Sequence, residues 1–423
     1  MLQIHWHSKT WFKLRFSGFD DEWKTYKLKD LLHNKSSSIS INQLDDNVGN
    51  YPLYGASGFL KCIDFYEMDS DYISIVKDGS GVGNISFHEK NTSVVNTSQY
   101  ILPKENLNIH FIFYLLQTIN LNKYKTGSTI PHIYFKDYSI EKVKIPKYDE
   151  QKKIGILLKN LDAKIEILDN KLQMCQNFKK YLMQQIFTQK LRFVDFNNSS
   201  WKDYKFKDLG TVKSGVGFSN KYQGHLDLDY NFYKVSDMNL KGNEKVMTRS
   251  NNTIDDNLLK DIGVKLIENP SIIFAKVGEA IFLNRKRIAK QPFLIDNNMM
   301  AFSPNENVDL EFMYYLATSI NFGKYAQTGA LPSYNASDIY SIKCKIPPIE
   351  EQKRIGKLLS LADNKIDFCS NQLNKTQEFK KGLLQQMFVV RINWRCNFKL
   401  AKSSSFNKHL LILKNKIIFI IIK

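Results

Sequence analysis

The chain has 423 residues, 43% of them hydrophobic and 13% aromatic, which is enough for two or three domains with their own cores and excludes a disordered polymer. Lys and Arg number 60 against 42 Asp and Glu, so the formal charge of +18 favours a polyanionic partner, unless it only reflects the lysine-rich proteins of a low-GC bacterium. The five cysteines form no C-x-x-C pair and the N-terminus lacks a signal-peptide pattern, so we expect reduced thiols, a cytoplasmic location and no membrane partner.

Two segments of the chain occur twice and divide it into four parts. A leading segment begins at Arg15 as "RFSGFDDEWKTYKLKDL" and at Arg192 as "RFVDFNNSSWKDYKFKDL", an offset of 177. A closing segment reads "KIPKYDEQKKIGILL" and later "KIPPIEEQKRIGKLL" at an offset of 201, as do "FKKYLMQQIF" and "FKKGLLQQMF", so the second globule is longer by 24 residues. The repeat predicts globules at 15–145 and 192–345, helices at 146–190 and 346–390, and an atypical tail at 391–423.

Both predicted helices carry the apolar period of a coiled coil. Apolar residues follow four- and three-residue spacings for roughly five heptads, with a lapse at Lys179. A seam this narrow and long indicates that the helices pack on each other, antiparallel; the alternative is that each packs only on its own globule. We therefore predict an α+β fold in which two mixed globules are separated by an antiparallel coiled coil, with an internal pseudo-two-fold repeat. The predicted seam residues are Ile154, Leu158, Leu161, Ile165, Leu168, Leu172, Ile355, Leu359, Ala362, Ile366, Cys369 and Leu373.

The globules read as mixed α and β and carry polar, glycine-containing loops. Short helices are expected at 109–119 and 310–320, each followed by such a loop at 124–138 and 325–340. Ser, Thr, Asn, Tyr and Lys in such loops can reach phosphates and base edges, and Arg285 and Arg287 can read guanine. Each of these residues can instead be ordinary solvated surface; the prediction concerns the set. The candidate DNA-binding residues are Ser57, Lys77, Ser80, Thr126, Ser128, Thr129, His132, Lys136, Lys221, Lys234, Lys276, Arg285, Lys286, Arg287, Ser333, Tyr334 and Asn335.

Catalytic and metal-binding patterns are missing from the sequence. "GSGVG" at Gly79–Gly83 lies between two β-like runs, which favours a hairpin turn over a phosphate loop that opens a helix. The nucleotide-binding pattern G-x-x-x-x-G-K-[ST] does not occur, and the eight histidines form no obvious metal or triad grouping. We therefore predict a binding protein without catalytic residues or metal ligands.

The duplicated segments carry a family resemblance that covers about residues 10–390. The "IP…EQK.IG.LL…D.KI" and "FKK.L.QQ.F" patterns, together with "YPLYGASGFL", "IVKDGSGVG", "TGSTIPHIYFKDY", "FYKVSDMN" and "TGALPSY", resemble the specificity subunits of type I restriction–modification systems. The resemblance implies that each globule is a target-recognition domain for one half of a split DNA site. It also implies that the helices form a conserved spacer, which sets the gap between the half-sites.

The resemblance implies partners as well. Two methyltransferase subunits would dock on the coiled coil, and restriction subunits would join them. S-adenosylmethionine, ATP and Mg would be bound by those partners and none of them by this chain. Because the globules differ in length and loop sequence, we expect an asymmetric double-stranded DNA target. The alternatives are a cytosolic coiled-coil scaffold without sequence-specific DNA binding and a fused restriction–modification enzyme.

The tail departs from the family pattern, whose chains normally stop near Phe388. We expect it to be a scar of recombination or of a shifted reading frame; a partner-binding extension is the alternative.

Overall fold

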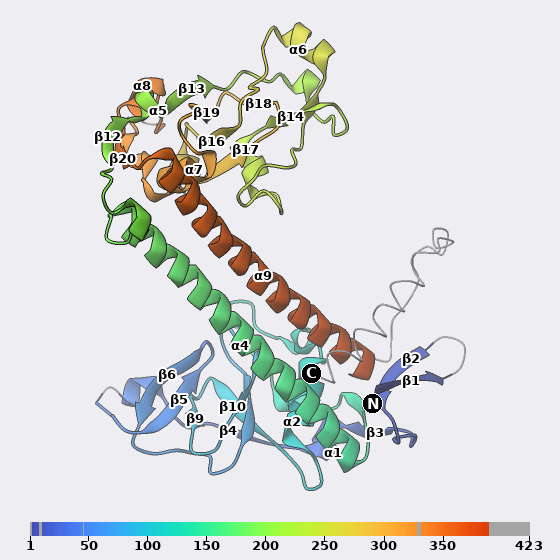
Figure 1. Ribbon diagram of the computed structural model, residues 1–423. Helices are drawn as coiled ribbons and strands as arrows, with labels where there is room; N and C mark the ends of the chain where they lie inside the picture. The colour runs from blue at the N-terminus through green and yellow to red at the C-terminus, as the bar shows by residue number, and fades with distance from the viewer. Residues whose placement is uncertain (1, 8–10, 45, 328–330, 389–423) are drawn as a thin grey trace. The chain divides into compact units, whose positions relative to one another are not determined.

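The computed structural model describes residues 2–7, 11–44, 46–327 and 331–388, so the tail at 391–423 lies outside the described residues. The chain divides into two compact units. Unit 1 runs to Ile165 and resumes at Lys375, and unit 2 is Glu166–Asn374. The boundary crosses both long helices, α4 (Tyr148–Phe187) and α9 (Ile349–Phe388), each of which has 40 residues (Figure 1).

Unit 1 is built on a four-stranded antiparallel sheet in the order β4-β10-β7-β8. A second sheet has the order β6-β5-β9, in which β5 pairs antiparallel with β6 and parallel with β9. The strands are β1 (Leu2–His7), β2 (Trp11–Phe16), β3 (Lys24–Lys27), β4 (Leu32–Ser36), β5 (Tyr51–Gly55), β6 (Gly58–Ile63), β7 (Tyr72–Val76), β8 (Ile85–His88), β9 (Ser93–Val94), β10 (Ser98–Pro103) and β11 (Lys142–Ile145). The helices are α1 (Leu28–Leu31), α2 (Ile109–Gln117) and α3 (Phe135–Tyr138), with 3-10 turns η2 (Ile41–Gln43) and η3 (Leu121–Tyr124).

Unit 2 repeats this topology. Its main sheet has the order β13-β19-β16-β17, and its second sheet pairs β14 antiparallel with β15 and parallel with β18. The strands are β12 (Lys202–Lys205), β13 (Gly210–Ser214), β14 (Tyr230–Tyr233), β15 (Thr253–Ile254), β16 (Ser271–Ala275), β17 (Lys286–Ala289), β18 (Phe293–Ile295), β19 (Met299–Pro304) and β20 (Lys343–Ile346). The helices are α5 (Phe206–Leu209), α6 (Asp256–Ile262), α7 (Leu310–Ser319) and α8 (Ala336–Tyr340), with 3-10 turns η4 (Val194–Phe196), η5 (Asn220–Tyr222), η6 (Val235–Asn239), η7 (Glu279–Ile281) and η8 (Phe322–Tyr325).

The extra length of the second globule lies largely between two strands of its smaller sheet. In unit 1, β5 and β6 are joined by a tight turn, because Gly55 pairs with Gly58. In unit 2 the connection from β14 to β15 occupies residues 234–252. Side chains of this longer connection contact the helices of unit 2. Among its described residues, unit 1 has no equivalent of these contacts.

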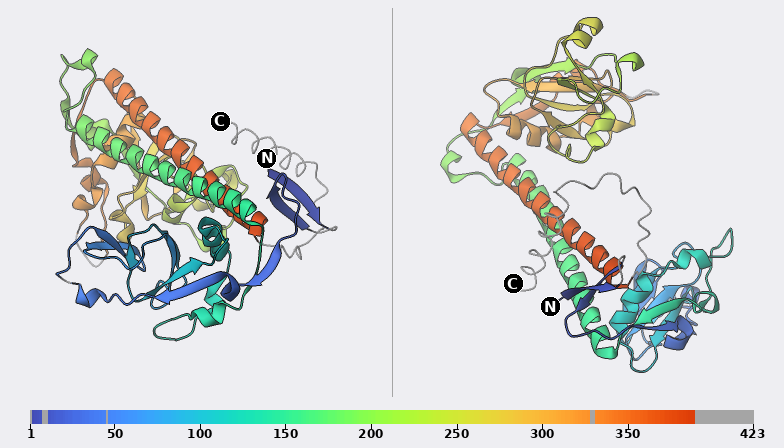
Figure 2. Two further views of the ribbon diagram at one scale, coloured as in Figure 1. Left: turned by 90° about the horizontal axis from the view of Figure 1, so that it is seen from below. Right: turned by 90° about the vertical axis from the view of Figure 1, so that its right-hand side faces the viewer.

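Each unit takes its core from a globule and from both long helices. In unit 1, Ile154 and Leu158 of α4 are buried in the same cluster as Leu383 and Met387 of α9. In unit 2 the helices exchange roles: the core contains the start of α9 and the end of α4, namely Ile355, Leu359, Leu182 and Ile186. The start of one helix therefore packs beside the end of the other within each unit, as Figures 1 and 2 show. The antiparallel coiled coil is confirmed, and each helix also packs on its own globule.

All twelve predicted seam residues are buried or half-buried. Leu158 and Leu359, for example, have no exposed side-chain surface. Among the described residues, no helix is both long enough and apolar enough to cross a membrane.

His88 is the last residue of β8, the edge strand of the main sheet of unit 1. Its burial makes the stability of unit 1 depend on pH. Its ring stacks on Tyr72, its Nε2 lies 2.8 Å from Ser74 Oγ, and burial lowers the pKa of His88 to about 4. The unfolded chain binds a proton near pH 6.5 and the folded one does not, so the stability of unit 1 falls as the pH drops from about 6.5 to about 4. Unit 2 has Ala289 at the matching strand position.

We expect His88→Ala to flatten this pH dependence in unit 1 and to leave unit 2 unchanged. Hydrogen exchange of the α2 and α7 peptides at pH 7 and pH 5 measures the two units separately. Equal loss of protection in wild type and variant between these pH values would contradict the assignment to His88.

Candidate functional site

Three loops of unit 1 that carry predicted DNA contacts meet at one place. The turn after β7 joins the loop after η3, because His132 forms bridges with both Asp78 and Thr126. The amide of Ile133 donates to the oxygen of Lys77 at 2.9 Å, and a Cβ at Gly81 would lie 3.0 Å from the Cβ of Ala56. The β5–β6 turn with Ser57 therefore borders the same cluster, and backbone hydrogen bonds hold it together.

Unit 2 builds the matching cluster with different side chains. Ser333 forms bridges with Val277 and with Gln327, and the amide of Tyr334 donates to the oxygen of Lys276 at 3.1 Å. Lys276 thus corresponds to Lys77, so the lysine is common to both clusters, whereas Ser333 stands where unit 1 has His132. The same framework with unlike side chains is what two readers of different sequences require.

The remaining candidate contacts differ in how accessible they are. Ser57, Ser80, Thr126, Ser128, Thr129, Lys136, Lys221, Arg285 and Asn335 are exposed, whereas Lys77, His132, Lys234, Lys276, Arg287 and Ser333 are half-buried. Lys234 donates to Gln223 Oε1 at 2.7 Å, which joins it to the segment of Lys221. The exposed and half-buried residues stay predictions.

Three of the predicted contacts have their polar groups turned inward. Lys286 is 2% exposed, donates to Asn284 and to the oxygen of Ile320, and burial lowers the pKa of Lys286 to about 7. Tyr334 is 5% exposed and donates to the oxygen of Ala275 at 2.6 Å. Arg287 donates to the oxygens of Lys286 and Met238. This conformation leaves the ammonium of Lys286 and the hydroxyl of Tyr334 no direct access to a base, and both Nη atoms of Arg287 are engaged with backbone oxygens.

The repeated Arg and Glu form a buried ion pair in each unit. Arg15 donates to Glu150 through Nε at 2.9 Å and Nη2 at 2.6 Å, and Trp23 Nε1 donates to Glu150 at 3.1 Å. In unit 2, Arg192 donates to Glu351 at 3.0 and 2.6 Å, joined by Trp201 at 3.4 Å. Each of these glutamates lies in the first turn of a long helix, where the helix dipole favours negative charge. Each also links the leading segment to that helix. The sequence carried a signal for this, since Arg, Trp and Glu all recur in both copies.

The next repeated residues fasten each globule helix to its long helix. Gln151 donates to the oxygen of Pro146 at 2.9 Å and accepts from the amide of Asn108 at 3.0 Å, at the start of α2. Gln352 makes the same two contacts in unit 2. A Cβ at Gly155 would come within 2.6 Å of Asn108 Oδ1, so this position requires glycine for close approach.

The repeated Asp joins a globule helix to both long helices. Asp162 accepts from Tyr114 of α2 at 2.6 Å and pairs with Lys380 of α9 at 2.5 Å. Burial, followed by donation to this carboxylate, raises the pKa of Tyr114. In unit 2, Asp363 accepts from Tyr315 and pairs with Lys179, both at 2.5 Å. The lapse in the heptad pattern at Lys179 is therefore an ion pair.

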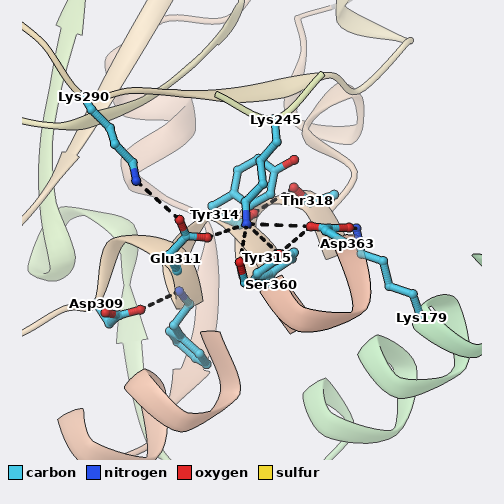
Figure 3. A network of polar contacts seen from close by, with 11 residues as sticks. Lys179, Lys245, Lys290, Asp309, Glu311, Tyr314, Tyr315, Thr318, Ser360 and Asp363 are labelled. Atoms are coloured by element: carbon cyan, nitrogen blue, oxygen red, sulfur yellow. Dashed lines mark hydrogen bonds and ion pairs between the residues drawn. The ribbon is translucent and has the colours of Figure 1, made fainter. Parts of the chain in front are cut away.

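Unit 2 adds a second cation, Lys245, to this network (Figure 3). Lys245, from the long β14–β15 connection, lies 2.8 Å from Tyr315 Oη, 3.2 Å from Ser360 Oγ and 2.6 Å from Glu311 Oε2. This carboxylate oxygen accepts no hydrogen bond of regular geometry, so the Glu311 contact is mainly electrostatic. At the positions of Ser360 and Glu311, unit 1 has Lys159 and His110, which lie 3.4 Å apart. Lys245 thus connects the inserted connection with α7 and α9.

We expect Lys245→Met to lower the free energy of unfolding of unit 2 by about 1–3 kcal/mol, because Glu311 and Asp363 lose a shared cation. Lys290→Met is the matched control, since Lys290 is half exposed and lies 3.8 Å from Glu311. Denaturant unfolding followed by hydrogen exchange of α7 measures both variants. Equal small effects of the two substitutions would contradict a central role for Lys245.

The profile of the type I restriction modification DNA specificity domain matches residues 20–175 and 198–378. The chain belongs to this family. Its two domain copies coincide with the repeated globules and the helices that follow them, so the duplication and the α+β fold with long helices are both confirmed.

Relatives and solved structures agree with this specificity-domain family. The chain is 21% identical over 403 residues to the type I restriction enzyme MjaVIII specificity subunit of Methanocaldococcus jannaschii, covering 88% of this chain and 93% of that one. It is 25% identical to the MjaIX specificity subunit of the same organism over 68% of this chain and 70% of that one. A crystal structure of a type I restriction–modification S subunit from M. genitalium matches with a TM-score of 0.63 at 16% identity, over 89% of this chain and 98% of that one, which supports the fold.

Within the part of the chain that the structure describes, no group of three or more His, Cys, Asp or Glu side chains could hold a metal ion. The specificity-domain family is one of recognition, and the polar networks above serve to hold the domains on their helices.

Proposed function

We propose that this chain is the specificity subunit of a type I restriction–modification complex, and that each unit binds one half of an asymmetric, bipartite double-stranded DNA target. The observation that carries the proposal is the pair of loop clusters around Lys77 and Lys276, which share a backbone framework and differ in side chains. Lys136 and Arg285 follow the cluster segments in sequence and are exposed, and Lys221 is exposed elsewhere in unit 2; all three suit phosphate contacts. We propose a cytoplasmic location, since the proposed DNA target lies there.

The long helices are proposed to dock the partner subunits. Ile167, Met174 and Tyr181 recur every seven residues on α4 and are 66%, 71% and 56% exposed, and Leu361 and Phe368 on α9 have the same spacing. Exposed apolar residues in such a row favour a partner helix. We propose that methyltransferase subunits with their S-adenosylmethionine bind there, and that restriction subunits with ATP and Mg join that complex.

Co-expression with a cognate methyltransferase in a host that lacks DNA methylation tests the proposal. Genome-wide sequencing of methylated bases is expected to show one bipartite, non-palindromic motif with a fixed gap. The recognition subunit itself would carry no catalytic step, so the chain alone should leave the genome unmodified. A palindromic motif would contradict the asymmetric reading. Copurification without any sequence-specific methylation would favour the scaffold alternative.

A further inference from the structure

One turn of the main sheet has the same framework in both units. In unit 1 it joins β7 to β8, and the amide of Val82 donates to the oxygen of Gly79 at 3.1 Å. In unit 2 it joins β16 to β17, and the amide of Ile281 donates to the oxygen of Gly278 at the same distance. Both glycines have positive φ, and both apolar residues are buried. The two turns are therefore equivalent up to this point.

The residues that follow make the turns different. The β7–β8 register ends at Ile75 and Ile85 and the β16–β17 register at Phe274 and Lys286, so the second turn is longer by two residues. Gly83 follows Val82, whereas Phe282 and Leu283 follow Ile281 and are 56% and 57% exposed. Where the first unit has no side chain, the second presents two large apolar ones that keep more than half of their surface exposed to water in the free protein.

The apolar tip of the second turn, Phe282 and Leu283, is fixed by contacts with the segment that follows α7. Asn284 Nδ2 donates to the oxygen of Ile320 at 3.1 Å, and its Oδ1 accepts from the amide of Phe322 at 3.0 Å. A Cβ at Gly323 would lie 3.3 Å from Phe282 Cδ1, so that ring is seated beside backbone. A rigid tip loses little conformational entropy on binding, which suits it to recognition.

The tip borders the loop cluster of unit 2. Gly278 donates to the oxygen of Pro332 at 2.8 Å, next to Ser333, and Arg285 follows the tip with an exposed side chain. Exposed cations favour a polyanion here, and in the major groove an apolar side chain distinguishes thymine by its methyl group. We propose that Phe282 and Leu283 form an apolar reading tip that contacts a thymine methyl group in the half-site bound by unit 2. Unit 1 has no equivalent.

This inference rests on the proposed function and is tested after it, with the assembled methyltransferase complex. Once the motif is known, duplexes carry deoxyuridine in place of thymidine at one position at a time, which removes only the methyl group. Wild-type complex is expected to bind about four-fold more weakly at one position, the factor that corresponds to about 0.8 kcal/mol for one buried methyl-sized group. Phe282→Ala should bind the thymidine and deoxyuridine duplexes equally.

Leu226→Ala provides the control, because Leu226 is 63% exposed in the same unit but precedes the smaller sheet. It should keep the four-fold discrimination. The methylated motif of the Phe282→Ala complex should be relaxed at that same position and unchanged in the other half-site. The inference would be overturned by a unit 2 half-site without thymine in either strand, by discrimination that survives in both Phe282→Ala and Leu283→Ala, or by loss of methyltransferase copurification in these variants. Failure of wild type to yield a bipartite motif would instead count against the proposed function.

Discussion

Replacing Glu150 with alanine is expected to lower the free energy of unfolding of unit 1 by about 3–5 kcal/mol, the usual cost of an uncompensated buried charge. The carboxylate is 1% exposed and receives Arg15 Nε at 2.9 Å, Arg15 Nη2 at 2.6 Å and Trp23 Nε1 at 3.1 Å. Without it, the Arg15 guanidinium stays in the core and keeps the oxygen of Asp21 as an acceptor at 2.8 Å. Hydrogen exchange of α2 in increasing denaturant measures the change.

The sequence offers a close control for this change. Glu350 also lies in the first turn of a long helix, one residue before the counterpart of Glu150, but it is exposed and pairs with exposed Lys353, so Glu350→Ala should cost no more than about 0.5 kcal/mol. Glu351→Ala should act on unit 2 as Glu150→Ala acts on unit 1, somewhat less strongly because the Arg192 side chain is 15% exposed. If Glu150→Ala were no more damaging than Glu350→Ala, the buried pair would not hold the leading segment to the helix.

The long helices could be predicted from the sequence because a heptad period is a local signal. The predicted helices at 146–190 and 346–390 correspond to α4 and α9, and the short globule helices at 109–119 and 310–320 correspond to α2 and α7. Period and length decided these elements, and no tertiary contact was needed. The pairing of Arg15 with Glu150 joins residues 135 positions apart, so only the recurrence of both residues in the second copy hinted at it.

The candidate contacts were harder to predict because exposure depends on the sheet. In β17, alternation places Lys286 on the same face as Ile288, which is fully buried, so the strand period points this lysine into the core. This strand alternation was visible in the sequence. It is a better guide to the orientation of Lys286 than the positive charge of the side chain. The close approach of the Lys77 and His132 segments could not be predicted from the sequence, because it depends on backbone pairing between separate loops.

The repeat therefore separates a constant part, which attaches each globule to the long helices, from variable loops. Arg, Trp, Glu, Gln, Gly, Asp and Lys of the duplicated segments make the same contacts in both units, and these contacts attach a globule to its helices. The loops between them share backbone pairing, a lysine and a glycine, but differ in other side chains such as His132 and Ser333. Changes of recognition can thus accumulate in the loops without loss of attachment, which is what a family of specificity proteins requires.

Removing one heptad from each long helix is expected to shorten the gap between the half-sites and to leave the base sequence of both half-sites unchanged. Deleting 166–172 from α4 together with 367–373 from α9 preserves the seam, because both deletions take out one full heptad at the repeat offset of 201. Seven helical residues rise about 10 Å, and one base pair rises about 3.4 Å, so the gap should shorten by up to about three base pairs. Methylome sequencing of the complex reads the new motif.

A four-residue deletion of 162–165 from α4 alone is the contrasting variant. It removes Asp162, which holds Tyr114 and Lys380, and it shifts the remaining seam residues of α4 out of phase with α9. We expect loss of assembly, seen as separate elution of chain and methyltransferase in size-exclusion chromatography. Altered half-site letters with an unchanged gap after the paired heptad deletion would rule out the spacer role, because the loops that read DNA would then depend on helix length while the spacing would not.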